Sequence, residues 1–413
     1  MVEGTFVKIR ELYFFRTARA ALLSVFPFVL IGSLAKTALM MLLEPDGFLS
    51  GMLGVQASGN AAGLAGGIHA LTCGLSGLLA AHYAAGYAAQ FAGRSYNTAA
   101  AAGFISYLAL CFQRAGSTHG FVFAYRMLGM QGLLIGIVFG YVVGRLFTVS
   151  GDLFAEIEGR DEAGRLPAGS FRMILPLVLS LAFATVLNLI GGTLFKGGVY
   201  QGMKASSENF PETLWLGLLT SLGTWCGLFG PYTGSIFTDD AVSTRNLNYA
   251  LAHGGSLVHV PYRLTTYSTW FAYAQLAGLG LLLALMFVSN RRNRRLLCWW
   301  CLLPVFFGYD AALDIGAPVI LNPLLLVPYV LVPQLNMAVV SAFYRSGILL
   351  PAVYPVADGT PPLLRAFLAT NGSPGALVCA VFLTALDAML FAVCIRFAER
   401  RISRLKGGVV DEE

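Results

Sequence analysis

Apolar residues gather in long runs that are separated by short polar stretches. Such runs lie near residues 20–43, 64–92, 97–113, 126–149, 172–196, 267–289, 316–347 and 375–398. Each is close to the length that an α-helix needs to cross the hydrocarbon core of a bilayer, roughly 20 residues. Weaker candidates lie at 213–237 and 296–315. The pattern predicts an all-α, polytopic membrane protein with about ten membrane-embedded segments, re-entrant hairpins among them.

The stretch from Pro211 to Tyr267 departs from this pattern. Its apolar pieces are interrupted by glycines and by polar residues such as Asp239, Arg245 and His259. Irregular, polar chain at membrane depth is tolerated only inside protein or beside a water-filled cavity. One interpretation is a re-entrant hairpin that lines a substrate path. The other is an ordinary extramembrane loop over about residues 238–262.

Basic residues cluster at the ends of the apolar runs. They lie in the amphipathic segment Phe6–Arg19, in Arg291–Arg295, in Arg400–Lys406 and in the charged stretch Asp152–Arg165. Because Lys and Arg are enriched in cytoplasmic loops, we expect these four stretches on the cytoplasmic side of the cell membrane. Both termini would then lie in the cytoplasm, and the number of crossings would be even.

Composition supports a lipid environment. The 413 residues are 57% hydrophobic and 12% charged, whereas soluble domains carry about 25% charged residues. The net charge of +6 does not indicate a nucleic-acid partner, because the basic residues follow the ends of the apolar runs and no basic patch interleaved with aromatic residues is present.

Reactive side chains form no recognisable catalytic or metal-binding pattern. The seven cysteines are scattered through apolar stretches and favour a role as small core residues. Cys298 and Cys301 have the spacing of a redox motif but lack its strand-and-helix context. His69 and His82 have no third ligand nearby in sequence. We therefore expect no cofactor, no metal and no catalytic residues in this chain.

A motif in the last third of the chain indicates a family. The stretch Phe307–Pro323 reads F-G-Y-D-A-A-L-D-I-G-A-P-V-I-L-N-P. It resembles the segment F-N-I-N-E-P-I-I-F-G-L-P-I-V-L-N-P of lactose- and cellobiose-type enzyme IIC permeases, the membrane components of sugar phosphotransferase systems. Weaker similarities follow in the same order as in the family, at Pro27–Ser33, Gly86–Phe112, Leu128–Leu133 and Leu166–Phe171.

The signature residues of the family are replaced. The sugar-binding glutamate of the N-E-P motif corresponds to Ala311. The family's G-I-H-G turn falls at Gly227–Gly230, where Phe229 stands in place of the histidine, and its G-G-S-G motif is represented only by Ala277–Gly280. The scaffold is thus similar while the binding-site signature differs.

Two carboxylates could supply the missing function. Asp310 and Asp314 are four residues apart and could share one helical face, and a carboxylate accepts hydrogen bonds from sugar hydroxyl groups. The alternative is that both lie in a water-exposed loop.

Further candidate sugar ligands are Asn248, His253 and Asn322, and Phe229 and Tyr232 could stack on a sugar ring, as could Trp225. For Asn322 a purely structural hydrogen bond is an equal alternative. Asp387, alone in the last apolar run, is expected to pair with a neighbour or to face the interior of the bundle.

The resemblance implies a membrane bundle over residues 1–200 that forms a homodimer interface, and a substrate-binding half over residues 201–413. It also implies a small sugar as substrate and a partner enzyme IIB, on a separate chain, that phosphorylates it. The alternative function is an enzyme IIC-like sensor, or a facilitator that no longer supports phosphotransfer.

Overall fold

The computed structural model describes residues 12–54, 59–114, 121–150, 169–197, 209–228, 230–233, 241–288 and 292–410. Most of these residues are helical, and the expected all-α membrane fold is confirmed. Within the described ranges, the exception is a short antiparallel hairpin in which β1 (Phe112–Arg114) pairs with β2 (Phe121–Phe123). The charged stretch Asp152–Arg165 lies outside the described residues.

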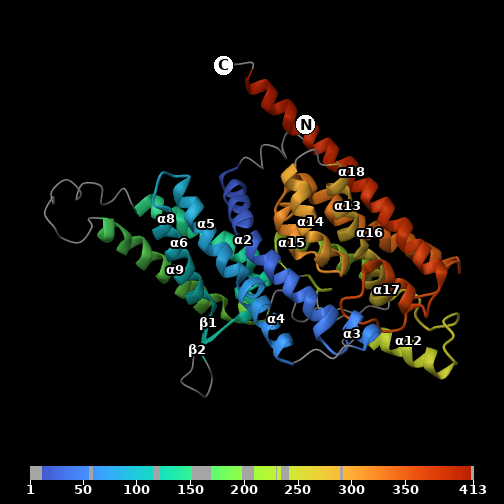
Figure 1. Cartoon of the computed structure of the whole chain (residues 1–413). Helices are drawn as coiled ribbons and strands as arrows, with labels where there is room; N and C mark the ends of the chain where they lie inside the picture. Colours follow the sequence, from blue (N-terminus) through green and yellow to red (C-terminus); the bar gives the residue numbers. More distant parts are fainter. Residues whose placement is uncertain are drawn as a thin grey trace.

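The described part of the first half of the chain is mainly helical (Figure 1). In order, its helices are α2 (Tyr13–Ala38), η1 (Leu39–Leu43), α3 (Phe48–Leu53), α4 (Gly59–Thr72), η2 (Cys73–Leu75), α5 (Ser76–Gln90), α6 (Tyr96–Cys111), α7 (Tyr125–Leu128), η3 (Met130–Gly132), α8 (Leu133–Ser150) and α9 (Gly169–Gly197).

The second half contains more short elements. In order they are α10 (Phe210–Cys226), α12 (Ala241–Ala252), the π-helical segment η5 (Tyr267–Ala274), α13 (Leu276–Val288), α14 (Arg292–Phe306), α15 (Ala311–Gly316), α16 (Pro323–Arg345), α17 (Pro362–Ala369) and α18 (Pro374–Val410). The weaker sequence candidates at 213–237 and 296–315 therefore correspond in part to α10 and α14.

Helices α5 and α8 approach so closely that their backbones touch. Gly136, Gly140 and Gly144 recur every four residues along α8 and share one face. A Cβ atom at Gly136 or Gly140 would collide with a carbonyl oxygen of α5, and at Gly144 it would lie 2.5 Å from the carbonyl oxygen of Ala85. Small residues at such spacing allow close helix packing in membranes.

One buried apolar cluster crosses between the two halves of the chain. It includes Val25 of α2, Ile137 of α8, Leu282 of α13 and Leu313 of α15. Helix α2 packs directly against α14 and α15. The division at residue 200 stays a prediction, and the first helix contributes to the core of the second half.

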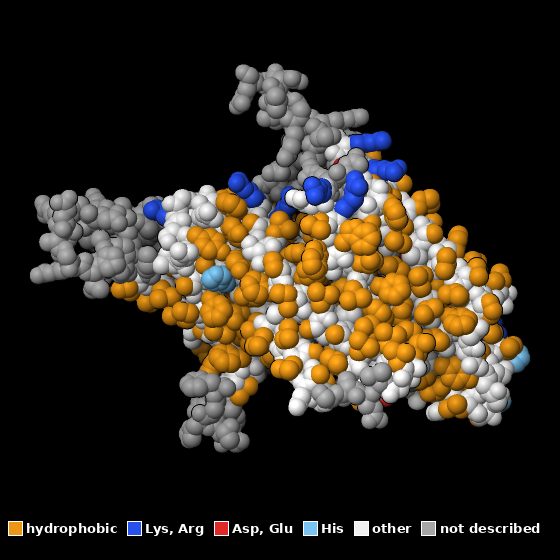
Figure 2. Space-filling model, viewed as in Figure 1, with side chains coloured by type: hydrophobic (Ala, Val, Ile, Leu, Met, Phe, Trp, Pro, Cys, Tyr) orange, Lys and Arg blue, Asp and Glu red, His pale blue; other side chains and the backbone are white. Residues whose placement is uncertain are grey.

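The exterior suits a bilayer. Apolar side chains cover the middle of the face shown in Figure 2, and Lys and Arg gather along one edge. Large apolar side chains such as Leu189 and Phe287 are about 80% exposed, at 79% and 81%. Such exposure is costly in water and ordinary in lipid.

Six of the described helical stretches are long and apolar enough to cross a membrane. They are Tyr13–Leu53, Gly59–Gln90, Met130–Thr148, Tyr267–Val288, Pro323–Arg345 and Pro374–Arg400, and a shorter apolar helix covers Ile174–Ile190. The expected total of about ten membrane-embedded segments stays a prediction. The start of α2 and the end of α18 lie at the same edge of the molecule (Figure 1).

Candidate functional site

A polar cavity of about 190 Å³ lies between elements of the second half of the chain and the start of α8. Its walls come from α10 and the turn that follows, the junction of η5 and α13, the α14–α15 turn, α16, α17 and the start of α8. Its polar lining consists of Thr220, Ser221, Thr224, Tyr232, Thr233, Trp270, Gln275, Asp310, Asp314, Tyr329 and Arg365. Ligand sites of this kind combine apolar walls with a few convergent polar groups.

Asp310 occupies the turn between α14 and α15. Its carboxylate lies over Gly278 of α13, where an added Cβ atom would be 2.9 Å from the Asp310 Oδ2 atom. The residue lines the cavity and is exposed to it. Asp310 therefore presents a carboxylate to any molecule that fills this space, and the absence of a side chain at position 278 makes room for it.

Asp314, one helical turn later in α15, is more enclosed. It is 4% exposed, and its Oδ2 atom accepts a hydrogen bond of 2.8 Å from the Tyr329 hydroxyl. The two carboxylates line the same cavity, as expected from their spacing. Asp310 is free to contact a ligand, whereas one carboxylate oxygen of Asp314 is already hydrogen-bonded to Tyr329 of α16.

Arg365 of α17 brings the opposite charge to the cavity. It is 5% exposed, donates from Nη1 to the Gln275 side chain and from Nε to the Thr360 carbonyl oxygen at 3.1 Å. Its guanidinium group also lies 4.8 Å from the centre of the Phe271 ring. A Cβ atom at Gly308 would collide with this guanidinium group. Arg365 is thus fixed in place, with its guanidinium group against Gly308, two residues before Asp310.

Hydroxyl groups and aromatic rings complete the lining. Helix α10 ends at Gly227, which has φ +82°, and the chain turns back so that the Tyr232 amide donates to Thr220 Oγ1 at 3.2 Å. The Tyr232 hydroxyl donates to the Thr213 carbonyl oxygen at 3.2 Å. The Tyr232 and Trp270 rings are 5.3 Å apart between centroids. This wall offers flat apolar faces beside hydroxyl groups.

The arrangement suits a small polyhydroxylated molecule. Carboxylates accept hydrogen bonds from hydroxyl groups, a guanidinium group donates them, and serine, threonine and glutamine can do either. Aromatic faces supply apolar contact to the C–H surface of a ring. Within the described part of the chain, no group of three or more His, Cys, Asp and Glu residues could hold a metal ion.

The structure brings three of the seven predicted site residues together. Asp310, Asp314 and Tyr232 line the cavity. Phe229 lies outside the described residues, although its neighbour Leu228 lines the cavity. The family's glutamate position, Ala311, lines it as well.

Asn248 and His253 do not line this cavity. Both are exposed at α12 or just after it, and α12 lies at the edge of the molecule (Figure 1). The His253 ring stacks on Tyr249 at 3.9 Å between centroids, and its Nδ1 atom is 2.8 Å from the Tyr249 carbonyl oxygen. Within Pro211–Tyr267, residues of α10 and of the turn that follows line the cavity, whereas α12 lies at the edge of the molecule.

Asn322 has a structural hydrogen-bonding role. Its Oδ1 atom accepts from the Leu324 amide at 3.2 Å and caps α16, and its Nδ2 atom donates to the Pro318 carbonyl oxygen at 3.0 Å. The Trp225 indole donates to the Asn322 carbonyl oxygen at 3.1 Å. Trp225 therefore supports this turn and is not among the residues that line the cavity.

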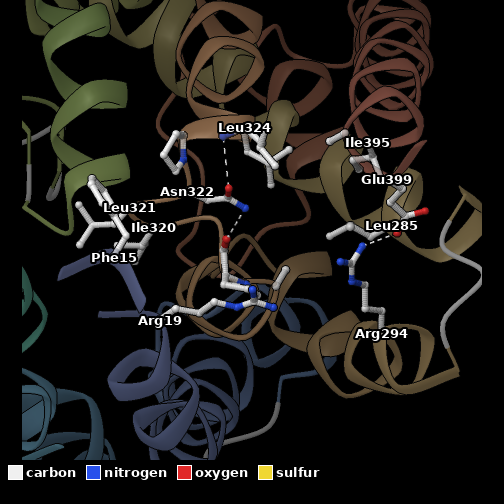
Figure 3. A pocket seen from close by; sticks show the side chains of 15 residues that line it. Phe15, Arg19, Leu285, Arg294, Ile320, Leu321, Asn322, Leu324, Ile395 and Glu399 are labelled. Carbon is white, nitrogen blue, oxygen red and sulfur yellow. Dashed lines mark hydrogen bonds and ion pairs between the residues drawn. The ribbon is translucent and has the colours of Figure 1, made fainter. Parts of the chain in front are cut away.

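A second, smaller cleft of about 60 Å³ lies on the other side of the same turn (Figure 3). Asn322 and Arg19 line it, together with the ion pair between Arg294 and Glu399, whose closest N–O distance is 2.5 Å. Ile320 lines both the cleft and the larger cavity. The turn around Ile320 is therefore a wall shared by the two spaces.

Sequence reasoning missed Arg365, Gln275 and Tyr329. A signal existed for Arg365, because an ionisable residue within an apolar stretch such as Pro361–Ala369 marks a candidate site. Gln275 interrupts an apolar run in the same way. Tyr329 carried no signal, because its role depends on Asp314 lying opposite it.

Comparison with known proteins gives relatives of one kind. No family model matches the chain. It is 21% identical over 271 residues to the oligo-β-mannoside-specific EIIC component of a PTS system from Bacillus subtilis, which covers 61% of this chain and 60% of that protein. It is 22% identical over 249 residues to a cellobiose-specific EIIC component from Lactococcus lactis, with 52% and 50% covered.

A third relative is the lichenan permease IIC component of Bacillus subtilis, 24% identical over 211 residues, with 49% of this chain and 42% of that protein covered. The chain thus spans 60% or less of the length of these three curated relatives. The expected resemblance to enzyme IIC permeases is confirmed by them.

Among solved structures, the chain is similar to the transporter ChbC, the IIC component from the N,N′-diacetylchitobiose-specific phosphotransferase system. The two chains share 18% identity over 98% of each, with a TM-score of 0.43.

Proposed function

We propose that this chain is the membrane permease, enzyme IIC, of a sugar phosphotransferase system. It binds a small sugar in the polar cavity and carries it across the membrane, and a partner enzyme IIB on a separate chain phosphorylates the sugar. The relatives are named for β-linked oligosaccharides such as cellobiose and oligo-β-mannosides, so a β-linked disaccharide is the first substrate to test.

The observation that carries the proposal is the composition of the cavity. Asp310 and Arg365 both line it, and the Tyr232–Trp270 pair supplies an aromatic wall. Two positions of family signatures, Ala311 and Gly227, line the same space. In the permeases that the chain resembles, the corresponding positions belong to the sugar site. Here Asp310 supplies a carboxylate beside Ala311, which replaces the family's glutamate.

We further propose that the chain is a homodimer in the cell membrane with both termini in the cytoplasm. The family resemblance supports the dimer, and the gathering of basic side chains at one edge supports the orientation. The partner enzyme IIB would approach that basic edge, because it works from the cytoplasm.

The test is sugar binding to the purified chain in detergent micelles, measured by thermal shift against mono- and disaccharides. A ligand that binds the native state raises its apparent stability. Replacing Asp310 by Asn removes a charged acceptor, and we expect the affinity to fall by about tenfold to a hundredfold, since a hydrogen bond to a charged group contributes about 1.5–3 kcal/mol. Asp46→Asn, at an exposed aspartate outside the cavity, is the matched control and should leave binding unchanged.

Sugar phosphorylation separates the permease from its alternatives. Vesicles that contain the chain, supplied with an enzyme IIB and a phosphoryl donor, should accumulate phosphorylated sugar, and the Asp310→Asn variant should lose this activity. Binding without phosphorylation would favour the sensor or the uncoupled facilitator. Absence of binding by every sugar tested would contradict the assignment of the cavity.

A further inference from the structure

Asp387 is a buried carboxyl group that the sugar cavity does not use. It lies in α18, inside the candidate span Pro374–Arg400, and is 0% exposed. Helix α13 passes directly over it, since a Cβ atom at Gly280 would be 2.5 Å from the Asp387 Cβ atom. An ionisable group in this position is expensive and marks a functional site by default.

Asn336 of α16 is its hydrogen-bond partner. Asn336 is also 0% exposed, and its Nδ2 atom donates to Asp387 Oδ2 at 2.8 Å and to the Tyr273 carbonyl oxygen at 3.4 Å. Because both neighbours are acceptors, the amide nitrogen must face them, which fixes the orientation of the amide. Asn336 therefore joins α18 to α16 and to the π-helical segment η5.

One oxygen of each partner remains without a donor. Among the described residues, Asp387 Oδ1 and Asn336 Oδ1 are buried and have no hydrogen-bond partner. A buried acceptor without a donor costs free energy, and a buried charge costs much more. Both costs fall on the same pair of side chains.

Among the described residues, no positive charge compensates Asp387. Helix α13 has no titratable side chain. The titratable groups on the helices packed against α18 are engaged elsewhere: Tyr329 with Asp314, Tyr344 with the Ser268 carbonyl oxygen, Arg345 with the Phe210 ring, Arg365 with Gln275 and Thr360. In α18 itself, Glu399 pairs with Arg294, and Arg396, Cys379 and Cys394 make no bond to Asp387 in the described chain.

We propose that Asp387 is a proton-binding site and forms a neutral acid–amide pair with Asn336. A proton taken from water onto Asp387 Oδ1 turns that oxygen into a donor, and Asn336 Oδ1 is the acceptor on the same planar partner. One proton then satisfies both unpartnered oxygens and removes the buried charge. The site lies on the contact between α16 and α18 and is separate from the sugar cavity, so it does not depend on the proposed transport activity.

The first test is the pH dependence of unfolding in detergent micelles, for the wild type and Asp387→Asn. An unfolded aspartate releases its proton near pH 4, whereas native Asp387 keeps it, so unfolding releases a proton and becomes easier as the pH rises. The side-chain amide of Asp387→Asn replaces the protonated carboxyl as a donor and does not titrate. The ratio of the two unfolding constants should therefore change by up to about tenfold per pH unit above pH 4, in favour of the variant.

Glu399→Gln is the control on the same helix, because its carboxylate is ion-paired with Arg294. It should keep the steep pH dependence of the wild type. Equal slopes for the wild type and Asp387→Asn would overturn the proposal. A sodium-dependent stabilisation that Asp387→Asn abolishes would overturn it too, since it would assign the two oxygens to a cation.

The second test does not depend on the folding of the Asp387 variant. The double variant Asp310→Asn with Asp314→Asn lacks the two cavity carboxyl groups. Its infrared spectrum at neutral pH should still show a carboxylic-acid C=O band that shifts in D₂O. Absence of that band would contradict a protonated Asp387.

Discussion

At the scale of single residues, two glycines fix the charged groups of the cavity. Gly278 leaves room for the Asp310 carboxylate and Gly308 leaves room for the Arg365 guanidinium group. Gly308 also has φ +81°, a conformation that costs other residues about 1–2 kcal/mol. The identity of both positions is therefore set by side chains that are distant in sequence.

We expect Gly308→Ala to lower the free energy of unfolding by more than the backbone conformation alone would, because the methyl group displaces Arg365 and disturbs the cavity. Gly347→Ala is the matched control: Gly347 has φ +74°, and an added Cβ atom there meets nothing within 4 Å. Gly347→Ala should destabilise the protein by about 1–2 kcal/mol and leave sugar binding intact. Unfolding and sugar titrations in micelles measure both effects, and equal behaviour of the two variants would contradict the steric argument.

Two of the three predicted residues that line the cavity share one property. Asp310 and Asp314 are carboxylates in an apolar region, which is unusual enough to indicate a site without any knowledge of the fold. Arg365 lines the same cavity but comes from a helix far along the chain, so its place beside the Asp310 turn depends on tertiary packing. Asn248 and His253 were placed in the site because a polar stretch does not reveal which part of it turns inward.

At the scale of elements, α16 begins at a turn that closes one wall of the cavity. Asn322 caps the helix and also bonds back to Pro318, while Leu321 adopts φ +55°. The apolar run at 316–347 predicted a span here, and the proline-led start at Pro323 marks where its helix begins. The periodicity could not separate α15, the turn and α16, because all three are apolar.

We expect Asn322→Ala to destabilise the protein by about 1 kcal/mol through loss of the cap, and to leave the sugar Kd unchanged. Asn322→Asp keeps the capping oxygen and should cost less. Unfolding in micelles and sugar titration separate the structural role from a role as a ligand. If Asn322→Ala weakened sugar binding without lowering stability, the earlier prediction of Asn322 as a sugar ligand would be favoured instead.

At the scale of the whole molecule, the charge distribution indicates how the protein sits in the bilayer. Basic side chains gather along one edge, near the end of α18, and α12 lies towards the opposite edge (Figure 1). From the positive-inside rule we expect the start of α14 to lie in the cytoplasm and the segment after α12 to lie outside.

Cysteine labelling of intact cells tests this orientation. We expect a membrane-impermeant thiol reagent to label Ser256→Cys and not Arg292→Cys, both of which are exposed positions. The native cysteines give little background, because five of the seven are buried. After the cells are opened, Arg292→Cys should react as well. Labelling of Arg292→Cys but not of Ser256→Cys in intact cells would show the opposite orientation in the membrane.

The backbone contact between α5 and α8 has a mechanical consequence. Where glycines let two helices touch through their main chains, no side chains remain between them that could change rotamer and absorb a displacement. We expect the pair to move as one rigid unit, and any large rearrangement during a working cycle to take place at contacts between other helices. Spin labels on α5 and α8 should keep a constant separation under all conditions, which makes this pair the fixed reference against which motion of other helices can be measured.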